Sequence, residues 1–149
     1  MLAEIKQFEL DDRLQLVKSL GIALIRSKPR RAALKLQFLN FSWEQLAVTD
    51  NASVFMDVSA VLVEFAIKNM KQQSVNNFIS EIFKRFRDFV KVGEDEEMYQ
   101  KLEHLIIKVM LTAKNFSELI GLDNFMSLLN YFSANIKFRL CEVMLDYFS

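Results

Sequence analysis

The sequence has few of the residues that make tight turns. Its 149 residues include only 3 glycines and 1 proline. Sheet proteins need glycine, proline, asparagine and aspartate in the turns that join their strands. The scarcity of glycine and proline therefore predicts an all-α protein, built as a single helical bundle or a short HEAT-like stack of about six to eight helices.

The sequence also has only 1 cysteine and 1 histidine, which argues against most catalytic and metal chemistry. A structural zinc site needs about four Cys, His or acidic ligands, so we expect no metal site. Acid–base and nucleophilic catalysis usually recruit histidine, and His104 lies beside Glu103 in a predicted helix, as a surface residue does. Cys141 follows Leu140 in an apolar stretch, which indicates a buried and inert thiol. We therefore expect no enzyme and no cofactor.

Neither sign of charge is in excess. Lys+Arg and Asp+Glu each number 19, so no overall field attracts nucleic acid, and the 52% hydrophobic fraction excludes disorder. No apolar run approaches the ~20 residues of a membrane-spanning helix, and no secretory signal is evident. A single cysteine cannot form an internal disulfide, which agrees with a reducing compartment. We expect one cytoplasmic domain over residues 1–149.

Apolar residues recur at spacings of three and four along most of the chain. They predict helices over residues 3–26, 29–39, 42–48, 51–70, 75–92, 97–114, 123–132 and 134–147, with a short helical turn over 115–120. Side chains that accept hydrogen bonds should cap several of these helices: Ser27, Ser42, Asp50 or Asn51, and Ser74. The acidic run 94–97 favours the positive end of the helix that follows it.

The helix predicted over 51–70 is apolar on more than one face, so it should be central or contact a partner. Asp57 lies on this helix. An unpaired buried carboxylate is costly, so Asp57 should pair with a cation inside the domain or on a partner, or lie at the surface.

Two surface features remain after this inventory. The first is a run of five cations in ten residues with no acid: Arg26, Lys28, Arg30, Arg31 and Lys35. A second group of cations alternates with phenylalanines: Lys84, Arg85, Arg87 and Lys91. Each group is either a solvated outer face or a surface for an acidic partner. The other feature is a surplus of large apolar residues, including 14 Phe and 7 Met, which fills a core or forms a partner face.

The stretch 17–115 resembles the conserved C-terminal domain of the non-catalytic (regulatory) subunit of katanin, the microtubule-severing AAA ATPase. A helix ends in Ile22-Ala23-Leu24-Ile25-Arg26-Ser27 and leads into basic residues. A later block, from Asp50 to Val58, is similar to the family's acidic or amide break followed by Ser-Val and Asp-Val. Two long helices then have apolar spacing like that of the family. Residues 116–149 have no counterpart in this resemblance.

The resemblance implies a regulatory scaffold that pairs with the N-terminal helical domain of the catalytic ATPase subunit. The pair would bind microtubules for severing, in the cytoplasm at the cytoskeleton, including spindle and centrosome. Six apolar residues are the expected partner-binding face: Leu34, Phe38, Val54, Phe55, Val58 and Leu62. The five cations of the first basic run are the residues expected to bind the acidic microtubule.

Two other functions are compatible with the same residues. A helical bundle with a hydrophobic groove would bind an amphipathic helix, as apoptosis regulators or viral adaptors do, and the apolar central helix and C-terminus motivate it. A small helical enzyme is the other alternative, and it would depend on His104.

Overall fold

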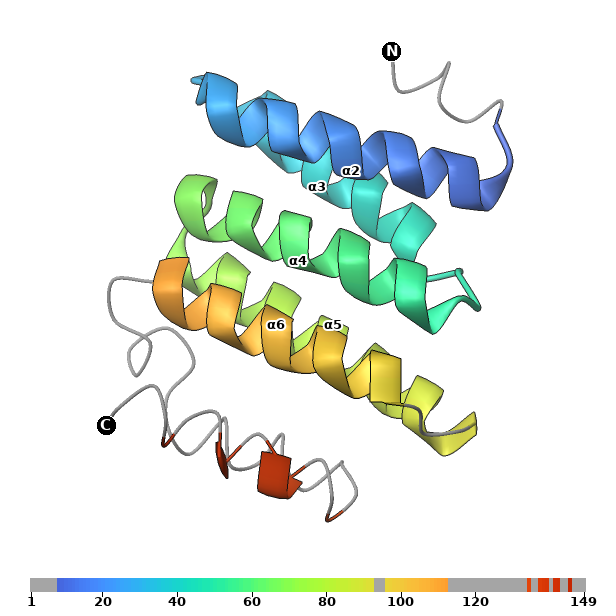
Figure 1. The fold of residues 1–149 in the computed structure, drawn as a ribbon. Helices are drawn as coiled ribbons and strands as arrows, with labels where there is room; N and C mark the ends of the chain where they lie inside the picture. The colour runs from blue at the N-terminus through green and yellow to red at the C-terminus, as the bar shows by residue number, and fades with distance from the viewer. Residues whose placement is uncertain are drawn as a thin grey trace.

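The computed structural model of the chain describes residues 8–92, 96–112, 134, 137–139, 141, 142 and 145. Every regular element among them is a helix, which confirms the all-α prediction. The helices with defined bounds are α2 (Leu10–Ser27), α3 (Ala32–Leu46), α4 (Ala52–Asn69), α5 (Gln72–Val92) and α6 (Glu96–Thr112). Helices α2, α4 and α6 form one layer and α3 and α5 form a second layer behind it (Figure 1). Consecutive helices run in opposite directions, as in a helical stack.

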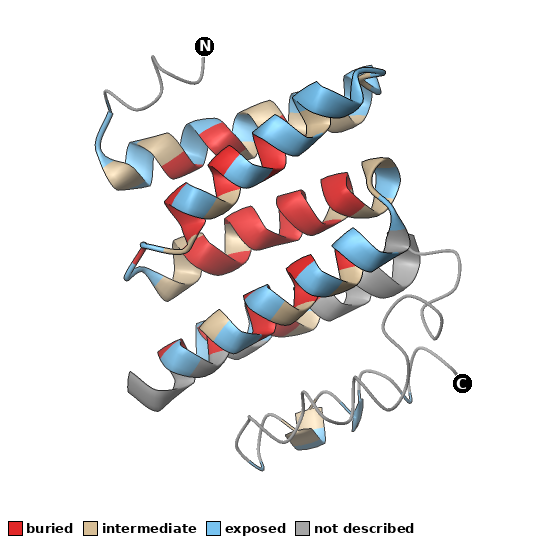
Figure 2. Cartoon of the chain, turned by 180° about the vertical axis from the view of Figure 1, so that it is seen from behind, coloured by how far each residue is buried: buried red, intermediate tan, exposed pale blue. Residues whose placement is uncertain are grey.

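Helix α4 is the centre of the stack, as its apolar sequence predicted. It packs against each of the other four helices. Phe55, Val58 and Leu62 are each 0% exposed, and most of α4 has the colour of buried residues in Figure 2. The predicted cap is also present, because the Asn51 Oδ1 atom accepts a hydrogen bond of 3.2 Å from the backbone N–H of Val54.

Phenylalanines fill much of this core. Eight of the 14 phenylalanines are buried among the described residues. The rings of Phe38 and Phe65 meet edge to face, with centroids 5.0 Å apart. Close approach of α2 to α4 depends on Gly21, where an added Cβ would lie 2.8 Å from the Cγ1 atom of Val61. The apolar surplus of the sequence is therefore used largely inside the domain.

The predicted break at residues 40–42 is wrong. The segments 29–39 and 42–48 form one helix, α3, which begins at Ala32 and ends at Leu46. Phe41 and Ser42 are buried in its middle. Packing against the core therefore outweighs the local tendency of serine and asparagine to interrupt a helix.

The three predicted serine caps, Ser27, Ser42 and Ser74, are also wrong, and Ser42 lies inside α3. Ser27 is the last residue of α2, and its hydroxyl donates a hydrogen bond of 3.3 Å to the Leu24 carbonyl. Lys28 then ends α2 in the left-handed region, with φ of 52°. Ser74 lies inside α5, which begins two residues earlier at Gln72.

The predicted start of the first helix at residue 3 is wrong, because Phe8 and Glu9 are not helical and α2 begins at Leu10. The remaining boundaries agree more closely with the prediction. Helix α6 has Glu96 and Glu97 in its first turn, as predicted. The described positions between 134 and 145 are helical. The helices predicted over 115–120 and 123–132 lie outside the described residues. No helix in the part of the chain that the structure describes is long and apolar enough to cross a membrane.

Candidate interaction surfaces

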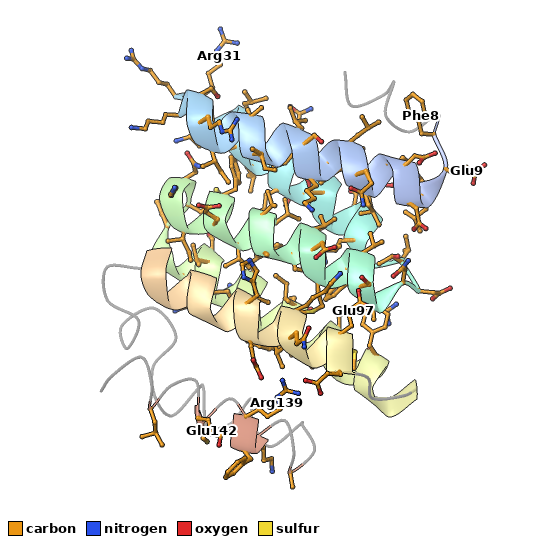
Figure 3. The ribbon with its side chains drawn as sticks, viewed as in Figure 1. Phe8, Glu9, Arg31, Glu97, Arg139 and Glu142 are labelled. Atoms are coloured by element: carbon orange, nitrogen blue, oxygen red, sulfur yellow. The ribbon has the colours of Figure 1, made fainter. Side chains whose placement is uncertain are left out.

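The first basic run lies where α2 passes into α3. We call its five residues the basic turn: Arg26, Lys28, Arg30, Arg31 and Lys35. Lys35 is half-buried and the other four are exposed. None of the five forms an ion pair with any residue of the described ranges. Figure 3 shows Arg31 at one end of the stack and Glu9 and Glu97 at the opposite end.

The cations of the basic turn do not stabilise α3, the helix that follows them. The N-terminal end of a helix carries partial positive charge and favours acidic side chains. Helix α3 has no acid in its first turn, and its N-cap residue, Arg31, makes no side-chain cap hydrogen bond. Helix α2, in contrast, has Asp11 and Asp12 in its first turn. The cations at the start of α3 are therefore in an electrostatically unfavourable position.

Most of the predicted apolar partner face lies in the core. Phe38 is 1% exposed. Phe55, Val58 and Leu62 are fully buried. Leu34 is 38% exposed, and Val54 is half-buried. In this conformation, Leu34 and Val54 are the members of that face that a partner can reach.

A polar cluster joins α4 to α6. The Lys101 Nζ atom lies 2.9 Å from Asp57 Oδ2 and 3.4 Å from Glu97 Oε1. It also donates to the Ser53 hydroxyl and carbonyl oxygens. Of the alternatives left open for Asp57, the structure shows the pairing with a cation of the same domain. Burial alone would lower the pKa of Lys101, but the hydrogen bonds and charges of Asp57 and Glu97 outweigh it, so the pKa is raised.

This cluster borders a groove of about 260 Å³ between α2, α4 and α6. Met56, Ala60 and Val61 of α4 contribute apolar lining. His104 lines the groove and is exposed, as its sequence context predicted. Within the described ranges, no group of three or more His, Cys, Asp and Glu residues is placed to hold a metal ion.

The second group of cations is partly structural. The Arg85 Nη2 atom donates a hydrogen bond of 2.8 Å to the Thr49 carbonyl, so it ties α5 to the α3–α4 connection. The Arg85 guanidinium also lies 4.6 Å from the centroid of the Phe89 ring. Lys84 pairs with Glu81 at 3.3 Å. The side chains of residues 87 and 91 lie outside the described set.

The C-terminal helical positions contact α6 through Arg139. Its Nε atom lies 2.6 Å from Glu103 Oε1, and its Nη1 atom lies 2.8 Å from Glu96 Oε2. The hydrogen bonds to these carboxylates raise the pKa of Arg139. The sequence did not predict this contact, because Arg139 is 36 positions from Glu103 and 43 positions from Glu96, and no helical periodicity relates residues so far apart.

The prediction that Cys141 is buried is wrong, because its side chain is exposed. Phe138 and Leu145, which are 65% and 70% exposed, lie three residues before and four residues after it. Residues at this spacing share one side of a helix. An apolar sequence context therefore did not imply burial here.

A two-layer stack of antiparallel helices is the architecture of bundle and solenoid proteins. The chain belongs, more specifically, to the family of the VPS35L C-terminal domain, which matches residues 2–149. The chain is 26% identical over 137 residues to the VPS35 endosomal protein-sorting factor-like protein of Homo sapiens. It is 24% and 23% identical over 137 residues to the proteins of the same name from Rattus norvegicus and Danio rerio. Each alignment covers 89% of this chain and 14% of the relative. No solved structure matches the chain.

The family overturns the katanin resemblance. The expected pairing with a katanin ATPase, the microtubule-severing role and the cytoskeletal location are all wrong, because the matching proteins are sorting-factor-like. The resemblance depended on the Asp50-to-Val58 block, which is the capped start of a buried helix and is common to helical domains. The comparisons do not support the apoptosis-regulator-like alternative either. The relatives are named as sorting factors, which agrees with the expectation that the chain is not an enzyme.

Proposed function

We propose that this chain is a non-enzymatic helical scaffold segment of an endosomal protein-sorting factor. The observation that carries the proposal is the family match, which extends over residues 2–149. The matching relatives are named as endosomal protein-sorting factor-like proteins, and the chain spans 14% of their length. A stack of packed helices with exposed charged turns suits a part that holds other proteins in place.

A chimera tests this function. In cells that lack the human relative, its homologous C-terminal segment is replaced by this chain, and the surface level of endosomally recycled membrane proteins is measured. We expect the chimera to reach endosomes and restore recycling at least in part. The same chimera with Phe55→Asp gives the baseline, because a carboxylate in the core prevents folding. A chimera that is folded and expressed normally but restores no recycling would refute the proposal.

Leu34 is the accessible apolar residue that we propose as a partner contact. Its side chain is 38% exposed on the first turn of α3. In the chimera, Leu34→Asp should reduce recycling without reducing expression. Val48→Asp is the control, because Val48 is 62% exposed and lies near the opposite end of α3. Equal recycling by the two variants would exclude Leu34 from the partner surface.

A further inference from the structure

We infer that one end of the helical stack docks on an anionic membrane surface. We call this end the basic end and define it as the basic turn together with Lys71. Helices α2, α3 and α4 are antiparallel and pack on one another, so the α2–α3 and α4–α5 connections lie at the same end (Figure 1). Lys71 is exposed in the second connection and forms no ion pair within the described ranges.

No carboxylate of the described ranges pairs with a cation of the basic end. The net charge of the protein is zero, so the rest of the chain carries an equal excess of acids over cations. Several acids lie toward the opposite end, where α2, α4 and α6 begin: Glu9, Asp11, Asp12, Asp50, Glu96 and Glu97. The molecule therefore presents a cationic end although it has no net charge. Such a local patch orients a protein on an anionic surface in a salt-dependent way.

Stability of the fold does not account for these cations. Arg30 and Arg31 precede the N-terminus of α3 and Lys35 lies in its first turn, where the helix dipole disfavours positive charge. None of the three contacts a carboxylate in the part of the chain that the structure describes. An external anion that binds these exposed cations offsets their unfavourable interaction with the helix dipole, and this explains their position.

A lipid surface fits this end better than an acidic protein does. The start of α3 combines its cations with an exposed leucine that the partner contact does not use, Leu36, which is 50% exposed. Long cationic side chains beside exposed apolar groups are typical of elements that lie in the membrane interface. The groove between α2, α4 and α6 is lined by no residue of the basic turn. A second groove, which Leu39, Trp43 and Phe78 help to line, contains none of these cations either. The endosomal location is part of the proposed function, whereas lipid binding is a property of this surface alone.

Vesicle sedimentation tests the inference directly. The full 149-residue chain is mixed with vesicles of phosphatidylcholine alone or of phosphatidylcholine with phosphatidylserine. We expect binding only to the anionic vesicles, and we expect it to weaken as ionic strength rises past about 0.15 M. Since each cation near an anionic leaflet contributes about five-fold in affinity, Arg30→Gln with Arg31→Gln should weaken binding about 25-fold.

The matched control removes two cations outside the basic end, Lys18 and Lys84, as Lys18→Gln with Lys84→Gln. Circular dichroism should show the same helix content in both double variants. Equal binding by the two variants, or equal binding to neutral vesicles, would overturn the inference. Binding to polyglutamate without binding to anionic vesicles would overturn it in favour of an acidic protein. The assay contains no sorting partner, so its failure leaves the chimera result unaffected.

Discussion

Two groups of cations on this molecule differ in whether carboxylates lie beside them. On the α4–α6 contact, Lys101 lies within 3.4 Å of two carboxylates, those of Asp57 and Glu97. At the basic turn, five cations have no carboxylate partner among the described residues. A cation that the chain itself neutralises holds two helices together, whereas a cation left exposed is available to another molecule. Composition does not distinguish the two cases, because both use ordinary lysine and arginine.

The largest effect should follow loss of the neutralised cation. Lys101→Met keeps the aliphatic stem but leaves Asp57 and Ser53 without their partner. We expect the free energy of unfolding to fall by about 1–3 kcal/mol in urea denaturation. The Lys101 side chain is only 22% exposed, which supports a measurable loss.

Lys84→Met is the control for this variant. Lys84 and Glu81 form a pair in which both side chains are about half exposed, 54% and 52%. Pairs this exposed contribute little, so we expect a change below about 0.5 kcal/mol. Equal losses in the two variants would mean that Lys101 has no special role in joining α4 to α6.

Loss of the side-chain cap at the start of α4 should lower the stability by a smaller amount. Asn51→Ala removes the hydrogen bond to the Val54 N–H at the start of α4 and should cost about 1 kcal/mol. Asn40→Ala is the control, since Asn40 is exposed in the interior of α3 and alanine is the better helix former. Thermal denaturation measures both changes. An equal loss in both variants would show that the cap is not the cause.

Replacing the cation at the start of α3 by an acid should raise the stability of the fold. Arg31→Asp places an acidic capping residue where the cation lies now. We expect a gain of about 0.5–1 kcal/mol, seen as a higher midpoint in thermal denaturation. The same variant should bind anionic vesicles more weakly than the parent chain. A loss of stability would show that Arg31 has a stabilising contact in the fold.

The smallest effect concerns pH and appears only in alkaline solution. Because the folded pKa of Lys101 is raised, its stabilisation is fully present below the unfolded value of 10.5 and is lost as the pH rises through the folded pKa. The stability difference between the parent and Lys101→Met should therefore be constant at neutral pH and shrink above pH 10.5. Urea denaturation of both chains at each pH isolates this contribution. A difference that stays constant at high pH would contradict it.

Helix α4 shows what local sequence predicts well. Its apolar residues occupy more than one face, and Asn51 precedes the first turn, so its position and central place were both foreseeable. Asp57 was also foreseeable as a paired carboxylate. Its partner, Lys101, was not, because the two residues are 44 positions apart and only the packing of α4 on α6 brings them together.

Helix α3 and Cys141 show where local sequence fails. Asn40, Phe41 and Ser42 have the composition of a break, yet two of them are buried in a continuous helix. Cys141 has apolar neighbours in sequence, yet it is exposed. In both cases, burial depends on which side of the helix faces the rest of the stack. The katanin resemblance failed for a related reason, since a short capped block carries information about a helix start and little about a family.

The sequence by itself determined the all-helical class, because few glycines and prolines and apolar spacings of three and four act through local backbone preferences. It also determined that five cations lie within ten residues that contain no acid. Only the tertiary structure decided that most of the expected apolar partner face is core. It also decided that Lys101 and Arg139 form ion pairs, whereas the basic turn forms none within the described ranges. Those outcomes depend on contacts between residues far apart in the chain, and such contacts exist only after the helices have packed.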